Sequence, residues 1–138
     1  MSIVVDANVV VALVTATPRR AAVSSWLDRW HAEAEDLHVP DLFTYEVASA
    51  LTGMEVARQV SSADSRRVWT LVDALDLTLH PPSGGAALVA IARRLRRTSA
   101  YDAAYIDLAL HLPAQLWTLD VALARNAESL GYPVRLMV

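Results

Sequence analysis

The chain has 138 residues, 54% hydrophobic and 20% charged, and its size and lack of low-complexity segments predict a single domain spanning residues 1–138. It contains no cysteine, which excludes disulfides, thiol catalysis and cysteine-based zinc sites. The formal net charge is −3 and all twelve basic residues are arginine, so the lysine-dependent P-loop is excluded as well.

The N-terminus opens with a short apolar run that ends on an acid. Ile3, Val4 and Val5 show no polar alternation, which is typical of a strand buried on both faces of a parallel sheet. Asp6 ends this strand, Asn8 follows it, and a second apolar segment covers residues 9–14. In open α/β sheets ligands bind beyond the carboxyl ends of the strands, so Asp6 is either an active-site carboxylate or a cap for the next helix.

Two helices and a strand are predicted over the next part of the chain. Thr17 and Pro18 are typical of an N-cap and a first helical position, and they predict a helix over residues 18–35. Residues 37–40 form a short strand candidate, after which Asp41 can cap a second helix that carries Glu46. Apolar residues repeat at helical spacing in both helices: Val23, Trp26, Leu27 and Trp30, then Phe43, Val47, Leu51 and Met54.

The middle of the chain continues the alternation. Ser61 and Asp64 form a capping-box pattern before a helix that ends near residue 75, and residues 77–80 are a strand candidate. Gly84 opens a helix, and the next helix starts at Ser99 and runs until Pro113.

The last part of the chain completes the pattern. Residues 115–119 predict a strand that Asp120 ends, and the following helix can stop at Gly131 in a left-handed conformation. Residues 134–137 give a final strand. Strands that alternate with helices predict a three-layer α/β/α sandwich with a central parallel sheet.

Four acids fall at comparable places in this layout. Asp6 and Asp120 directly follow strands, whereas Glu46 and Asp102 lie in early turns of helices. Helices in such a fold begin at the edge where strands end, so all four can converge on one crevice. Like charges converge there at a cost unless a cation is present, and Mg²⁺ or Mn²⁺ prefers oxygen ligands of this kind. Phosphoryl chemistry is the natural interpretation.

Each acid also has a purely structural explanation except one. Asp102 can complete a capping box with Ser99, and Asp6 or Asp120 can favour a helix N-terminus. Glu46 has no such local role. Asp107 lies five residues beyond Asp102, about 140° around the helix, and is expected to be solvated.

Four segments, taken in chain order, resemble a PIN domain and more narrowly the VapC toxin family of small bacterial and archaeal endoribonucleases. These segments are Val4-Val5-Asp6-Ala7-Asn8, Pro40-Asp41-Leu42-Phe43-Thr44-Tyr45-Glu46-Val47, Tyr101-Asp102-Ala103-Ala104-Tyr105 and Trp117-Thr118-Leu119-Asp120. The resemblance implies an RNA-cleaving enzyme that depends on Mg²⁺ or Mn²⁺.

The same resemblance implies the site residues and partners. It gives Asp6, Glu46, Asp102 and Asp120 as catalytic and metal-binding acids, with Thr118 and Asn8 in supporting positions. It also implies an antitoxin protein that blocks the site and a toxin homodimer. The short apolar runs and the N-terminus without a basic region predict a soluble, cytoplasmic protein with no membrane contact.

Several alternatives are weaker or stay open. Receiver domains and dehalogenase-type phosphatases also use an acid after the first strand, but they are expected to need a lysine that this chain lacks. His31, His38, His80 and His111 show no metal-ligand spacing. A cluster of arginines either binds RNA phosphates or is a solvated helix face: Arg93, Arg94, Arg96 and Arg97. A non-catalytic PIN-like module that binds RNA or protein also stays open.

Overall fold

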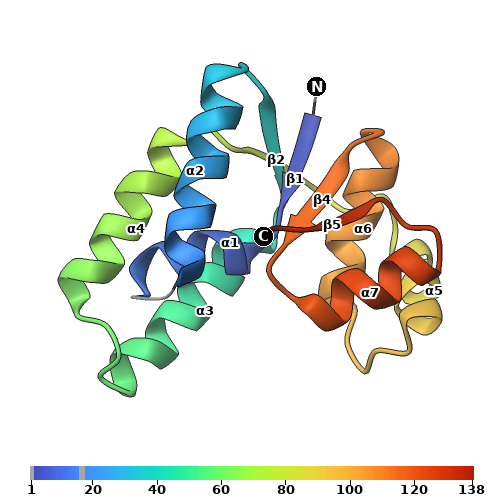
Figure 1. Ribbon diagram of the computed structural model, residues 1–138. Coiled ribbons are helices and arrows are strands. Elements are labelled where there is room, and N and C mark those ends of the chain that lie inside the picture. Colours follow the sequence, from blue (N-terminus) through green and yellow to red (C-terminus); the bar gives the residue numbers. More distant parts are fainter. Residues whose placement is uncertain (1, 16–17) are drawn as a thin grey trace.

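The computed structural model describes residues 2–15 and 18–138 (Figure 1). Five strands form one sheet: β1 (Ser2–Val5), β2 (Asp36–Pro40), β3 (Thr78–His80), β4 (Gln115–Thr118) and β5 (Val134–Leu136). Between them lie the helical segments α1 (Ala7–Val11), η1 (Ala12–Val14, a 3₁₀ turn), α2 (Pro18–Ala32), α3 (Phe43–Val56), α4 (Ser62–Ala74), α5 (Gly85–Leu95), α6 (Tyr101–His111) and α7 (Val121–Ser129). The predicted alternation of strands and helices is confirmed.

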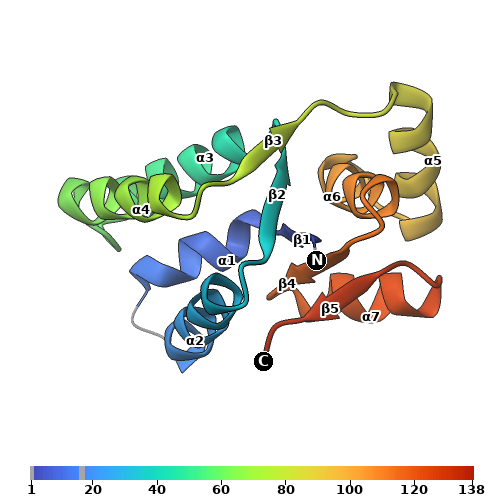
Figure 2. The same ribbon diagram turned by 90° about the horizontal axis from the view of Figure 1, so that it is seen from above.

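The sheet is entirely parallel, with the strand order β3-β2-β1-β4-β5. The chain therefore moves outward from β1 in one direction and later returns to add β4 on the other side of β1. Because connections between parallel strands are right-handed, this reversal sends helices to both faces of the sheet. Figure 2 shows α1 to α4 on one side and α5 to α7 on the other, which confirms the three-layer prediction. Order reversal between β1 and β4 creates the crevice where such folds bind ligands.

Helix α6 is the most deeply buried helix of the described chain. It packs against β1, β2 and β4 and carries α5 on its outer side, so residues 103–109 are all buried. The prediction that Asp107 is solvated is therefore wrong: its side chain is 4% exposed because this helix has no solvent-facing side at that level. The backbone N–H of Ser83 donates to Asp107 Oδ2 at 3.2 Å, and the Ser83 hydroxyl donates to Oδ1 at 2.6 Å.

Helix ends show which local signals were reliable. The capping box of Ser61 and Asp64 is present, and Gly131 has a φ of +79° as predicted. Asp41 does not cap α3: its backbone N–H donates to the carbonyl of His80 and extends the β2–β3 pairing, and Leu42 occupies the N-cap position.

Two further capping predictions have different outcomes. Ser99 does not form a capping box with Asp102: Ala100 is the N-cap of α6, and the Asp102 carboxylate is paired with Arg97 instead. The predicted N-cap Thr17 lies outside the described residues. Helix α2 ends at Ala32, before the predicted residue 35, since Ala34 adopts a left-handed φ of 54°.

Three tryptophans fix β4 against α2. Trp117 of β4 lies 4.6 Å from Trp26 and 5.5 Å from Trp30 between ring centroids. Aromatic pairs of this kind contribute about 0.5–1.5 kcal/mol each beyond the burial of their surface. The cluster therefore holds β4 in place, and the last residue of this strand, Thr118, belongs to the site described below. Among the described helices, none has the length and apolar character that a membrane crossing requires.

Candidate active site

The site is built where the adjacent strands β1 and β4 end. The backbone N–H of Asp6 donates to the carbonyl of Trp117 at 3.0 Å, so the pairing of the two strands continues into the first acid. Asp6 precedes α1 in extended conformation, but its side chain makes no capping hydrogen bond to that helix. Asp6 therefore occupies the predicted N-cap position of α1, where its backbone carbonyl accepts from the N–H of Val9 at 3.1 Å, but its carboxylate is not used for capping.

A small hydrogen-bond network fixes the Asp6 carboxylate. The buried Thr118 hydroxyl donates to Asp6 Oδ2 at 2.7 Å, and the Asn8 amide donates to the same oxygen at 3.3 Å. Asn8 also donates to Thr118 Oγ1 and accepts from the backbone N–H of Leu119. Thr118 and Asn8 thus connect the end of β1 to the end of β4 around Asp6. They are the two residues that the family resemblance implies as supporting residues of the acids.

Glu46 and Asp102 approach from the first turns of α3 and α6. Burial, with smaller contributions from the charges of Asp102 and Glu46, raises the pKa of Asp6 to about 7, although the Thr118 hydrogen bond opposes the rise. Burial also raises the pKa of Glu46, opposed by the Tyr105 hydroxyl and reinforced by Asp102. These acids therefore lie close enough to repel one another.

Asp120 and Asp102 share one cation. Burial raises the pKa of Asp102, and the charge of Arg97 opposes that rise. Arg97 Nε lies 3.6 Å from Asp102 Oδ2, and its Nη2 lies 4.0 Å from Asp120 Oδ2. The other oxygen of Asp120 accepts from the backbone N–H of Leu123 at 2.9 Å, so the capping role predicted for Asp120 is confirmed alongside its position at the site. All four predicted acids meet at the carboxyl edge of the sheet.

Comparison with known proteins identifies the family. A family model described as PIN domain matches residues 3–129. The chain belongs to the PIN-domain family. VapC ribonuclease Mb0985 from Mycobacterium bovis is 34% identical over 96 residues, covering 70% of this chain and 74% of the relative. Ribonuclease VapC3 from Pyrobaculum aerophilum is 30% identical over 138 residues, covering 96% of this chain and 100% of the relative. The resemblance inferred from the four sequence segments is confirmed.

Solved structures support the same PIN-domain fold. PAE2754 from Pyrobaculum aerophilum has a TM-score of 0.69 at 21% identity, over 91% of this chain and 79% of that chain. FitAcB from Neisseria gonorrhoeae has a TM-score of 0.61 at 17% identity, over 99% of this chain and 96% of that chain. At these identities the likeness concerns the fold alone.

The acids of this PIN domain suit a hard cation in charge and donor type. Glu46 Oε1 is buried, and its neighbour among the described residues is the Tyr105 hydroxyl. A buried carboxylate with so few donors around it favours a divalent ion as an additional partner. Within residues 2–15 and 18–138, however, no three His, Cys, Asp or Glu side chains are spaced to hold one ion by themselves. Mg²⁺ needs only one or two direct carboxylates, because it keeps waters and meets substrate phosphate.

The arginine cluster is divided by the fold. Arg97 alone faces the acids, whereas Arg94 lies over the ring of Tyr132 and donates to its hydroxyl. Arg93 and Arg96 are exposed, and Arg96 adopts a left-handed φ of 56° where α5 ends. That turn directs the chain back towards α6. Sequence spacing could not distinguish Arg97 from its neighbours, because the turn depends on the backbone at Arg96.

Two more groupings arise only from the tertiary structure. Tyr105, which is buried in α6, brings its hydroxyl beside Glu46. His38 Nδ1 and His80 Nε2 lie 2.8 Å apart on the paired strands β2 and β3, although nothing in their spacing linked them. Burial, reinforced by His80, lowers the pKa of His38.

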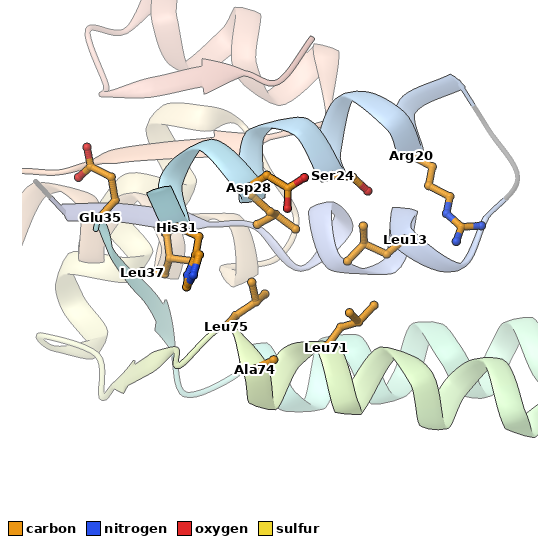
Figure 3. Close-up of a pocket in the computed structure, with 11 residues that line it drawn as sticks. Leu13, Arg20, Ser24, Asp28, His31, Glu35, Leu37, Leu71, Ala74 and Leu75 are labelled. Atoms are coloured by element: carbon orange, nitrogen blue, oxygen red, sulfur yellow. The ribbon is translucent and has the colours of Figure 1, made fainter. Parts of the chain in front are cut away.

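A separate cleft lies away from the four acids. It has a volume of about 390 Å³ and runs between α2 and α4. Figure 3 shows Leu13, Leu71 and Leu75 pointing into it, with Asp28 and His31 of α2 along its rim. None of the four predicted acids lines this cleft, so we do not assign it to the active site.

Proposed function

We propose that the protein is a metal-dependent endoribonuclease, the toxin of a type II toxin–antitoxin pair, which hydrolyses RNA phosphodiester bonds. The observation that carries the proposal is the convergence of Asp6, Glu46, Asp102 and Asp120 at the β1–β4 crevice with the pKa of Asp6 raised to about 7. Such an arrangement is unfavourable without a cation. The relatives named VapC ribonuclease support the substrate class.

The residues of the chain take distinct roles in this proposal. Asp6, held by Thr118 and Asn8, presents a carboxylate in a fixed orientation, and Glu46, Asp102 and Asp120 add the other negative charges of the cluster. Mg²⁺ or Mn²⁺ bound there lowers the pKa of a water and stabilises charge on the scissile phosphate. Arg97 adds a positive charge at the edge where an RNA phosphate approaches. Arg93, Arg94 and Arg96 are left with at most a weak role in binding RNA.

The direct test is cleavage of structured RNA by the purified protein. Wild-type protein is expected to cut RNA with Mg²⁺ or Mn²⁺ and to stop when EDTA is added. Asp6→Asn should lower the rate by about 100- to 1000-fold, because removal of one group that stabilises transition-state charge typically costs that much. Asp73→Asn, the same change on the exposed face of α4, is the matched control and should cleave normally.

The rival function is a non-catalytic module that binds RNA or protein. It is favoured by the absence, within the described residues, of three acids spaced to hold one ion. Equal cleavage by wild-type protein and Asp6→Asn would point to a contaminant or another site. RNA binding without metal-dependent cleavage would leave the binding module as the function.

The proposed partners follow from the toxin assignment. We infer a cognate antitoxin that covers the acids, a homodimer in solution, and action on RNA in the cytoplasm. Light scattering after gel filtration tests the homodimer. Co-expression with the product of an adjacent short gene tests the antitoxin, which should co-purify and suppress cleavage.

A further inference from the structure

We infer that Tyr45 and Tyr101 form a nucleobase-binding subsite that holds one unpaired base of the RNA beside the cleaved bond. The inference rests on the proposed function and adds the part of the substrate recognised there. It arises from two exposed aromatic residues, each directly preceding one of the four acids in sequence: Tyr45 precedes Glu46, and Tyr101 precedes Asp102.

The two tyrosines are unusual in their exposure. The side chain of Tyr45 is 80% exposed and that of Tyr101 is 62% exposed, although both lie at helix starts that face the acids. Tyr105, one turn further along α6, is by contrast buried in the core. Two neighbouring rings left in water add nothing to the core, so their surface is available for a ligand.

The rings border one hollow that adjoins the acidic site. It has a volume of about 440 Å³ and is lined by Leu42, Tyr45, Glu46, Ser49, Ala50 and Tyr101. Glu46 belongs both to this hollow and to the four acids, so a molecule in the hollow lies next to the site. Of the lining residues, only Glu46 is charged, and it is acidic.

The chemistry of the lining selects a base over a phosphate. An acidic hollow without arginine repels a phosphate group, whereas aromatic rings stack on the flat faces of nucleobases. Ser49, Glu46 and the phenol groups supply donors and acceptors of the kind that base edges use. Arg19, by contrast, lines a separate hollow of about 310 Å³ beside Asn8 and Asp120. The aromatic rings thus adjoin Glu46, whereas this cation adjoins Asp120.

The first experiment measures binding without cleavage. A short single-stranded RNA containing 2-aminopurine is titrated into Asp6→Asn protein, and stacking is followed as quenching of the base fluorescence. Replacing either ring, Tyr45→Ala or Tyr101→Ala, should weaken binding by between about 5- and 100-fold, as loss of one base–aromatic stack does. Tyr45→Phe keeps the ring and should bind within about twofold of the parent.

The controls separate stacking from other effects. Tyr132→Ala makes the same deletion just before β5, at the edge where strands begin, and should not change quenching. A fully paired duplex of the same sequence should not be quenched, because its bases are already stacked. Alanine is a good helix former at exposed positions, so Tyr45→Ala should not unfold α3.

The outcomes distinguish this inference from the proposed function. Absence of metal-dependent cleavage with ring-dependent quenching would defeat the nuclease and keep the subsite. Alanine variants that bind as the parent does, or Tyr45→Phe losing as much as Tyr45→Ala, would overturn the subsite. A change from dimer to monomer in Tyr45→Ala without loss of quenching would also overturn it, since the rings would then belong to a contact between two copies.

Discussion

Two buried carboxylates in this protein have opposite surroundings. Asp6 at the end of β1 is 8% exposed and Asp107 in α6 is 4% exposed, so burial alone does not distinguish them. Both oxygens of Asp107 accept hydrogen bonds from Ser83, and His111 Nδ1 lies 3.4 Å from Oδ1. The side-chain hydrogen bonds to Asp6 converge on one oxygen, and the nearest charges are two further acids.

The difference separates a carboxylate that stabilises the fold from one that is set aside for a ligand. Asp107 anchors the connection between β3 and α5 and is satisfied by the chain itself. Asp6 is held in place but not neutralised, which destabilises the metal-free protein and favours a bound cation.

The largest expected difference is in stabilisation by metal. At a concentration of Mn²⁺ one hundred times its dissociation constant, the free energy of unfolding should rise by about 2.7 kcal/mol. Asp107→Asn should keep this gain, because Asp107 is remote from the cation, whereas Asp6→Asn should lose most of it. Thermal unfolding with Mn²⁺ and with EDTA measures both. A wild-type melting temperature indifferent to millimolar Mn²⁺ would refute the metal site.

Removal of Asp107 should lower the stability of the fold and leave RNA cleavage intact. Asp107→Ala leaves the Ser83 hydroxyl and backbone N–H without their acceptor, and should lower the free energy of unfolding by about 2 kcal/mol. Urea denaturation in EDTA measures the loss. The variant that remains folded should still cleave RNA near the wild-type rate. A loss of cleavage at full stability would show that Asp107 belongs to the chemistry after all.

The pH dependence of metal-free stability should follow Asp6. Its folded pKa of about 7 lies above the ordinary value of 3.8, so the folded state binds the proton more tightly than the unfolded state. The stabilising contribution is therefore present below pH 3.8 and is lost as the pH rises through about 7. The raised pKa values of Glu46 and Asp102 act in the same direction.

The substitution Asp6→Asn isolates this effect. The variant cannot titrate at position 6, so its stability should fall less than that of wild type between pH 5 and pH 8, by on the order of 1 kcal/mol. Unfolding in EDTA across this pH range gives the difference between the two curves. Parallel curves would mean that burial does not shift the pKa of Asp6 as described.

The sequence was sufficient for the strand–helix order and for the convergence of the acids. Both follow from one rule: in a parallel sheet the ends of strands and the starts of helices share an edge. Asp6, Glu46, Asp102 and Asp120 could therefore be brought together without coordinates. Strong local signals such as the Ser61–Asp64 capping box could also be predicted from the sequence.

Features that depend on packing between distant segments could not be predicted in this way. Helical geometry predicts that Asp107 faces solvent, on the side of α6 turned away from the sheet. In the structure α5 packs on α6. Asp41 had the residue type of a cap, but the β2–β3 pairing continues through its backbone N–H and α3 begins one residue later, with Leu42 at the N-cap. The separation of Arg97 from the other arginines required the left-handed turn at Arg96. In each case tertiary contacts outweighed a local preference.

The smallest expected effect concerns Arg97, the one cation within 4.0 Å of the acids among the described residues. Its ion pairs with Asp102 and Asp120 are half-exposed, and such pairs contribute about 0.2–1 kcal/mol. If Arg97 serves as a substitute cation in the metal-free site, Arg97→Gln should lower the dissociation constant of Mn²⁺ by about two- to fivefold. Arg93→Gln, at an exposed position of α5, should leave calorimetric Mn²⁺ binding unchanged. Weaker binding by Arg97→Gln would mean that the guanidinium instead orders the acids for the ion, so that Arg97 supports the charge that Asp6 and its neighbours create rather than competing for it.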